Sequence, residues 1–167
     1  MINTRERGNF MNSAAIQEAR TKHQPAGKWH RAVTRLNSIP VLASLEELAG
    51  MERPPHFVCF KNAALNMEPR IPCGWDVIID TIVGFVFRDS TPGFVIRGVF
   101  WQEGEFALEL RGEAVLRQVE IAEDGVRLCN TNSQYEDERL SLSALDKMLA
   151  LGQLRVLGAV VMIGPSL

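Results

Sequence analysis

Apolar and β-branched residues occur along most of the chain in short runs, which are separated by glycine, proline and polar residues. Runs of four to eight such residues, bounded by turn-forming residues, are typical of β-strands rather than of amphipathic helices. A continuously apolar run at 77–79, which begins three residues after Gly74, indicates a tight turn followed by a buried strand. The strands predicted in this way are residues 56–60, 77–79, 81–87, 93–101, 105–110, 113–119, 126–128 and 154–161.

Two other segments have helical features. Residues 142–151 combine apolar and polar positions at helical spacing and end at Gly152, and residues 45–49 fit one helical turn that ends at Gly50. A hairpin turn is predicted at 102–104, between two of the strands. Many short strands and little helix predict a mainly β fold, coiled into a small, partly open barrel or paired sheets.

The first 36 residues differ from the rest in charge. They contain seven basic residues and two acidic ones, a net charge of +5, whereas the whole chain carries −2 and residues 37–167 therefore carry −7. Within this arm, residues 13–20 and 29–36 are predicted to form short helices. We therefore expect two parts, a basic, partly helical or disordered arm at 1–36 and a β domain at 37–167.

The arm offers the chain's candidates for nucleic-acid contact, which are Lys22, Lys28, Arg31 and Arg35. Such a cluster attracts phosphate groups or an acidic partner, but it is equally typical of a solvated tail. The two predicted helices are too few for the multi-helix heads that read the major groove. DNA binding is thus a weakly supported alternative.

Composition narrows the class of protein. With 46% hydrophobic and 23% charged residues, the 167-residue chain resembles ordinary globular proteins, and no apolar run approaches the roughly 20 residues needed to span a bilayer. The first residues lack the apolar core of a signal peptide, so a cytoplasmic protein is expected. The three cysteines and three histidines have no metal-ligand spacing, so neither a metal nor a cofactor is expected; they are Cys59, Cys73, Cys129, His23, His30 and His56.

The stretch 65–80 carries the most specific pattern, Leu-Asn-Met-Glu-Pro-Arg-Ile-Pro-Cys-Gly-Trp-Asp followed by an apolar strand that ends in Asp. It resembles the nucleophile segment of the LexA/UmuD-type S24 peptidases and phage repressors, which reads Ser-Met-x-Pro, then Ile-Pro-x-Gly-Asp, then a strand ending in Asp. In this chain Asn66 stands at the serine position, followed by Met67 and Pro69. An asparagine amide is a very poor nucleophile.

Further blocks of the same resemblance follow in order, over roughly residues 39–163. Residues 113–119 resemble the family's Val-Lys-Arg-Leu strand, residues 130–135 its Asn-Pro-x-Tyr loop and residues 154–161 its closing strand. This alignment puts Arg117 at the position of the catalytic lysine. A guanidinium stays protonated at physiological pH, so it does not serve as the general base of a Ser-Lys pair.

The resemblance therefore implies an S24-like coiled β-ribbon in which both catalytic positions are replaced, and a protein that is not an enzyme. We expect Asn66 and Arg117 to be hydrogen-bonded to each other or to a neighbouring loop. The implied role is regulation or interaction in prophage, mobile-element or SOS-type transcription control, with a related repressor or a transcription protein as partner. Family members pair through their final strand, so a homodimer through 154–163 is expected.

An active peptidase with relocated catalytic groups is the alternative. Ser44, Ser90 and Ser133 supply hydroxyl groups, Lys61 and Lys147 supply amines, and Cys73 supplies a thiol. The small-residue–glycine bonds that a self-cleaving member would use, 26–27 and 49–50, are poorly placed ahead of Asn66.

Overall fold

The computed structural model describes residues 39–82 and 93–165, and 49% of them lie in strands and 12% in helices. The prediction of a mainly β fold is confirmed. The elements are β1 (Val41–Leu42), α4 (Leu45–Ala49), β2 (Phe57–Lys61), β3 (Asp76–Asp80), β4 (Gly93–Ile96), β5 (Val99–Gln102), β6 (Gly104–Leu110), β7 (Glu113–Ala122), β8 (Gly125–Cys129), β9 (Glu138–Ser141), α5 (Leu142–Ala150) and β10 (Leu154–Gly164).

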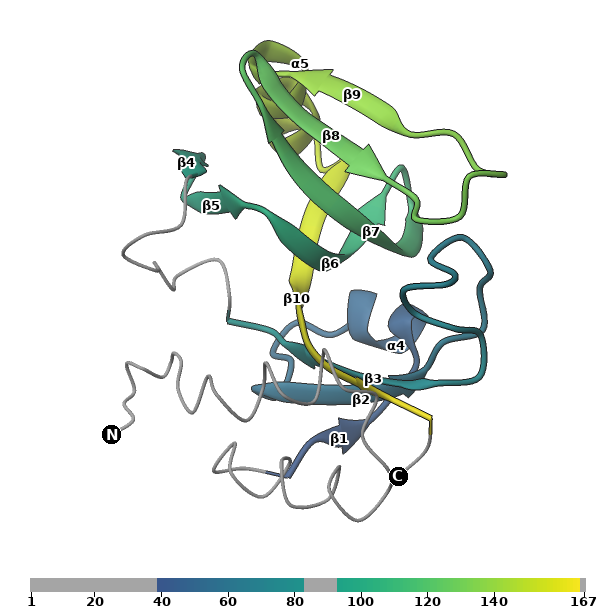
Figure 1. The fold of residues 1–167 in the computed structure, drawn as a ribbon. Helices are drawn as coiled ribbons and strands as arrows, with labels where there is room; N and C mark the ends of the chain where they lie inside the picture. The colour runs from purple at the N-terminus through teal and green to yellow at the C-terminus, as the bar shows by residue number, and fades with distance from the viewer. Residues whose placement is uncertain (1–38, 83–92, 166–167) are drawn as a thin grey trace.

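Eight of these strands form one open sheet in the order β1-β2-β3-β10-β6-β7-β8-β9, and β4 and β5 form a separate hairpin. The β1–β2 pair is parallel, and the other pairs are antiparallel. Figure 1 shows two groups of strands, β1–β3 with α4 and β6–β9 with α5, which the long β10 connects. The sheet does not close into a barrel.

β10 belongs to both groups because its two halves pair on opposite sides. Residues 154–159 pair with β6, residues 159–164 pair with β3, and Ala159 pairs with both. The register shifts once in each half, which lets the strand bend as it passes from one group to the other. At the crossing, a Cβ on Gly158 would lie 2.3 Å from Cγ2 of Ile79 and 2.5 Å from the Asp80 carbonyl oxygen.

Each group of strands has its own apolar core. The first contains fully buried side chains of β2 and β3 together with Leu48 of α4 and Met67 and Ile71 of the β2–β3 loop. The second lies between β6–β9 and α5 and includes Trp101 and Leu145. Leu157 and Val160 of β10 belong to the first core and Leu154 belongs to the second, so one strand contributes to both.

The predicted strands agree with the structure except around residues 93–110 and at 81–82, which form a turn, and β9 was not predicted. The predicted strand 93–101 is two strands, and the hairpin turn is at Arg97-Gly98 rather than at 102–104. Both turn residues have positive φ, 50° and 77°, as two-residue hairpin turns of this kind require, but Arg-Gly is not a usual signal for such a turn. β5 and β6 do not pair; only Glu103 separates them.

Some of the predicted elements lie outside the described residues. They are the two helices of the arm at 1–36 and most of the strand at 81–87. Within the described ranges no helix has the length and apolar character needed to span a bilayer.

Substituting Gly158 by alanine should destabilise the protein because a Cβ has no space where β10 crosses β3. We expect the free energy of unfolding, measured by urea titration, to fall by about 1–3 kcal/mol. Gly50→Ala is the matched control, since Gly50 has a φ of −85° and a Cβ there meets nothing closer than 3.6 Å. Equal stability of the two variants would contradict this view of the crossing.

Candidate functional site

The segment 62–75 between β2 and β3 has no regular structure, yet it is held firmly at both ends. Its first residue, Asn62, is 3% exposed, and its side-chain amide donates to the carbonyl oxygens of Ala64, Ile71 and Pro72 at 3.1, 3.0 and 3.3 Å. The Asn62 Oδ1 accepts from the Ala64 N–H at 3.2 Å. One buried amide therefore replaces the backbone pairing that a strand would supply.

The loop between β8 and β9 binds the other side of this segment. The Asn132 N–H donates to the Asn66 carbonyl oxygen and Asn132 Nδ2 donates to the Leu65 carbonyl oxygen, both at 3.0 Å. The Thr131 hydroxyl donates to the Met67 carbonyl oxygen. The resemblance had singled out this loop, but its contact with the Asn66 segment was not predicted.

An ion pair attaches the same segment to the sheet. Arg70 Nε donates to Oε2 of Glu105 on β6 at 3.0 Å, and Glu105 is only 7% exposed. A carboxylate this deeply buried requires compensation of its charge, and Arg70 supplies part of it. The pair was not predicted, because the two residues are 35 positions apart in the sequence.

Asn66 is 8% exposed, and both hydrogens of its side-chain amide have acceptors. Nδ2 donates to the Leu116 carbonyl oxygen at 3.0 Å and to Asn130 Oδ1 at 2.8 Å. Asn130 is held in turn by its own Nδ2, which donates to the Glu136 carbonyl oxygen at 2.7 Å. A hydroxyl has one hydrogen and could not make both bonds of the Asn66 amide.

Arg117 lies on β7, next to Leu116, and is half-buried. Its Nη1 donates to the Leu116 carbonyl oxygen at 2.8 Å, the same atom that accepts from Asn66. Burial lowers the pKa of the Arg117 guanidinium, and the carboxylates of Glu138, Glu113 and Asp137 oppose this change.

Asn66 and Arg117, which the resemblance aligns with a nucleophile and a base, thus converge on one carbonyl oxygen, although 51 positions separate them in the sequence. Two neighbouring positions of the motif, 67 and 69, differ in burial. Met67 is fully buried in the first core, whereas Pro69 is exposed.

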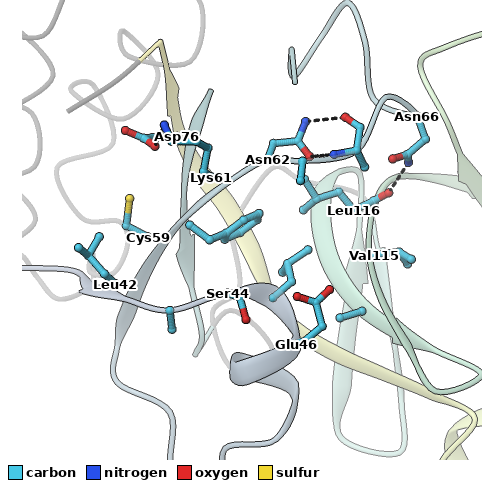
Figure 2. A pocket seen from close by; sticks show the side chains of 16 residues that line it. Leu42, Ser44, Glu46, Cys59, Lys61, Asn62, Asn66, Asp76, Val115 and Leu116 are labelled. Atoms are coloured by element: carbon cyan, nitrogen blue, oxygen red, sulfur yellow. Dashed lines mark hydrogen bonds and ion pairs between the residues drawn. The ribbon is translucent and has the colours of Figure 1, made fainter. Parts of the chain in front are cut away.

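Beside Asn66 is a cavity of about 790 Å³, between α4, β2 and β7 (Figure 2). Its walls are mainly apolar, and Asn66 and Leu116 lie at one end. The lining residues are Leu42, Ala43, Ser44, Leu45, Glu46, Cys59, Phe60, Lys61, Asn62, Ala63, Ala64, Asn66, Asp76, Ala114, Val115 and Leu116.

Most of the ionisable groups in this cavity are neutral or neutralised. Lys61 Nζ lies 3.0 Å from Asp76 Oδ1 and also donates to the Gly74 carbonyl oxygen at 3.2 Å. Burial and, to a smaller extent, the Asp76 carboxylate raise the pKa of the Cys59 thiol to about 12, so it is protonated at neutral pH. Glu46, on the exposed side of α4, forms no ion pair with any of the described residues.

Two of the lining residues, Cys59 and Lys61, also belong to a backbone edge of β2. The Asn62 N–H donates to Trp75 on the β3 side of β2, and the Cys59 carbonyl oxygen accepts from Ala43 on the β1 side. Because backbone groups alternate along a strand, those of Lys61 point to the same side as those of Cys59. β1 ends before it reaches Lys61, and the described residues supply no backbone hydrogen bond there.

The relocated catalytic groups are not assembled in the described part of the chain. Ser44 is the N-cap of α4 and its hydroxyl accepts from the Glu47 N–H at 3.0 Å. Lys61 Nζ is bound to the Asp76 carboxylate and the Gly74 carbonyl oxygen rather than to a hydroxyl group of the described residues. Ser133 and Lys147 are exposed on separate elements, and Ser90 lies outside the described residues.

The remaining candidates are the cysteine and the histidines. Cys73 is exposed, and its N–H donates to Glu68 Oε2 at 3.1 Å. His56 Nε2 lies 3.3 Å from Asp80 Oδ1, whereas His23 and His30 lie outside the described residues. Over 39–82 and 93–165 no three His, Cys, Asp or Glu side chains are placed to hold a metal ion.

The nucleic-acid candidates Lys22, Lys28, Arg31 and Arg35 all lie outside the described residues. Neither a protein-family model nor a curated protein matches this chain.

Replacing Asn66 by serine should weaken the fold, because one hydroxyl hydrogen replaces two amide hydrogens, so the bond to Leu116 or the bond to Asn130 is lost. We expect the free energy of unfolding to fall by about 1–3 kcal/mol in chemical denaturation. Gln134→Ala is the control, because only the backbone of this exposed residue is hydrogen-bonded, and we expect it to change stability by less than about 0.5 kcal/mol. If the free energy of unfolding of Asn66→Ser equals that of the wild type, the hydrogen bonds of the Asn66 side-chain amide contribute no net stability.

The three thiols should differ in reactivity. Burial raises the pKa of Cys59 to about 12 and that of Cys129 to about 11, whereas Cys73 is exposed. Because the thiolate is the reactive form, one thiol per chain should react rapidly with a disulfide reagent at pH 8, and all three should react after denaturation. Cys73→Ser should abolish the rapid phase; a rapid phase that survives this substitution would contradict the burial of the other two.

Proposed function

We propose that the protein is a catalytically inactive S24-like domain that acts as a regulatory or interaction protein. The observation that carries this proposal is the pair Asn66 and Arg117. An amide with both hydrogens bonded and a guanidinium stand at the positions that the resemblance aligns with a hydroxyl and a neutral amine. Neither side chain supplies the nucleophile or the base for acyl transfer.

The cavity next to Asn66 then serves for binding rather than for hydrolysis. The unpaired backbone edge at Lys61 supports this use, because an extended peptide could continue the sheet where β1 ends. The apolar walls would accept its alternate side chains. The bound segment would belong to a partner protein and would leave the site intact.

The setting that best fits such a protein is the cytoplasm, in prophage, mobile-element or SOS-type transcription control. A related repressor or a transcription protein is the partner that the resemblance favours. A homodimer through Leu154–Ile163 is part of this proposal, but β10 is an inner strand. A second copy could not pair along the whole of β10 without displacing β3 or β6, so the contact would use only part of the strand.

A fluorophosphonate probe, which labels activated serines, tests the absence of catalysis. The wild-type chain should remain unlabelled, and it should stay full length at alkaline pH or with an activated recombinase filament. The double variant Asn66→Ser/Arg117→Lys should gain labelling at position 66, because it restores a hydroxyl and an amine. Burial, which lowers the pKa of the Arg117 guanidinium, favours a neutral lysine at the same position. Asn66→Ser alone is the matched control and should remain unlabelled, since Arg117 does not accept the proton.

Labelling or specific cleavage of the wild-type chain would contradict the proposed loss of catalysis. A folded double variant that remains unlabelled would contradict the assignment of residues 66 and 117 to the two catalytic positions. Circular dichroism of each variant establishes that it is folded, so a negative result is informative.

A further inference from the structure

Glu46 is the one ionic side chain in the cavity wall for which the described residues provide no counter-charge. Of the other ionisable groups there, Lys61 and Asp76 neutralise each other across 3.0 Å and the Cys59 thiol is protonated. Figure 2 shows the Glu46 carboxylate among the lining side chains, which also include Val115 and Leu116 of β7. An occupied cavity would bring this carboxylate next to its ligand.

We infer that Glu46 makes the cavity selective for an extended protein segment that carries a lysine or arginine. This inference rests on the proposed function and adds the chemistry of the partner. A carboxylate at the wall favours a cationic side chain and disfavours an anionic one, and such pairing contributes more to specificity than to affinity. The net charge of −7 on residues 37–167 acts in the same direction at longer range.

The exposed position of Glu46 limits how strongly the cavity can prefer a cationic side chain. Its side chain is on the exposed side of α4, so water screens the interaction. A pair of this kind corresponds to a preference of about two- to fivefold for a lysine over a neutral residue of similar size. The preference should decrease with added salt.

Binding of a peptide panel to the full-length chain tests this inference. The probes are fluorescent nonapeptides of valine, threonine and alanine, in which one residue at each position in turn is lysine, glutamine or glutamate. For the best position, we expect the order lysine, glutamine, glutamate in fluorescence anisotropy. Glu46→Lys should reverse this order. Glu47→Lys is the matched control, because Glu47 is the next residue of the same helix, is exposed and does not line the cavity.

A panel without any preference for lysine, or equal effects of Glu46→Lys and Glu47→Lys, would overturn the inference. The chain's own residues 1–36, with their charge of +5, are a competing occupant. Suppose that no peptide binds and that Glu46→Lys, but not Glu47→Lys, accelerates tryptic cleavage of residues 1–36. The occupant of the cavity is then this segment of the same chain, and the proposal of a partner chain is wrong. Labelling of the wild-type chain by the fluorophosphonate probe would contradict only the proposed function, because this labelling does not depend on the charge at residue 46.

Discussion

The two hydrogen bonds of the Asn66 side-chain amide join three parts of the molecule. The amide belongs to the segment between β2 and β3, its first acceptor belongs to β7, and its second belongs to the loop after β8. Because Asn66 is almost fully buried, loss of the amide would remove both of these connections, and among the described residues only the Leu116 carbonyl oxygen would keep another donor, Arg117 Nη1. The Asn66 side chain is thus bound into the framework of the fold.

Around this amide, the structure uses side chains where backbone pairing is missing. Asn62 organises the start of the segment, Asn132 binds it from the adjacent loop, and Arg70 attaches it to Glu105. The apolar side chains of Met67 and Ile71 fill the core beneath it. The segment therefore has an ordered shape without regular secondary structure, and it forms one end of the cavity on which the proposed function depends.

Local pattern was sufficient to predict most strands, α4, α5 and the mainly β class, since each of these depends on a short run of residues. The prediction missed the hairpin turn at Arg97-Gly98 because both residues have positive φ, and the residue type of Arg97 does not indicate this conformation. Asn62, Asn132 and the Arg70–Glu105 pair were missed for a different reason. Their partners are distant in sequence or are backbone carbonyls, and no pattern along the chain identifies them. Asn66 and Arg117 were found only through the resemblance, and their shared acceptor at Leu116 required the fold.

Hydrogen exchange of the Asn66 side-chain amide, followed by NMR, is the most direct measurement of the central claim. If both hydrogens are bonded inside the protein, as the distances of 3.0 and 2.8 Å to their acceptors indicate, they should exchange far more slowly than those of the exposed Gln134 side chain. Exchange at the rate of Gln134 would mean that Asn66 is a free side chain in an open site, and would contradict the account.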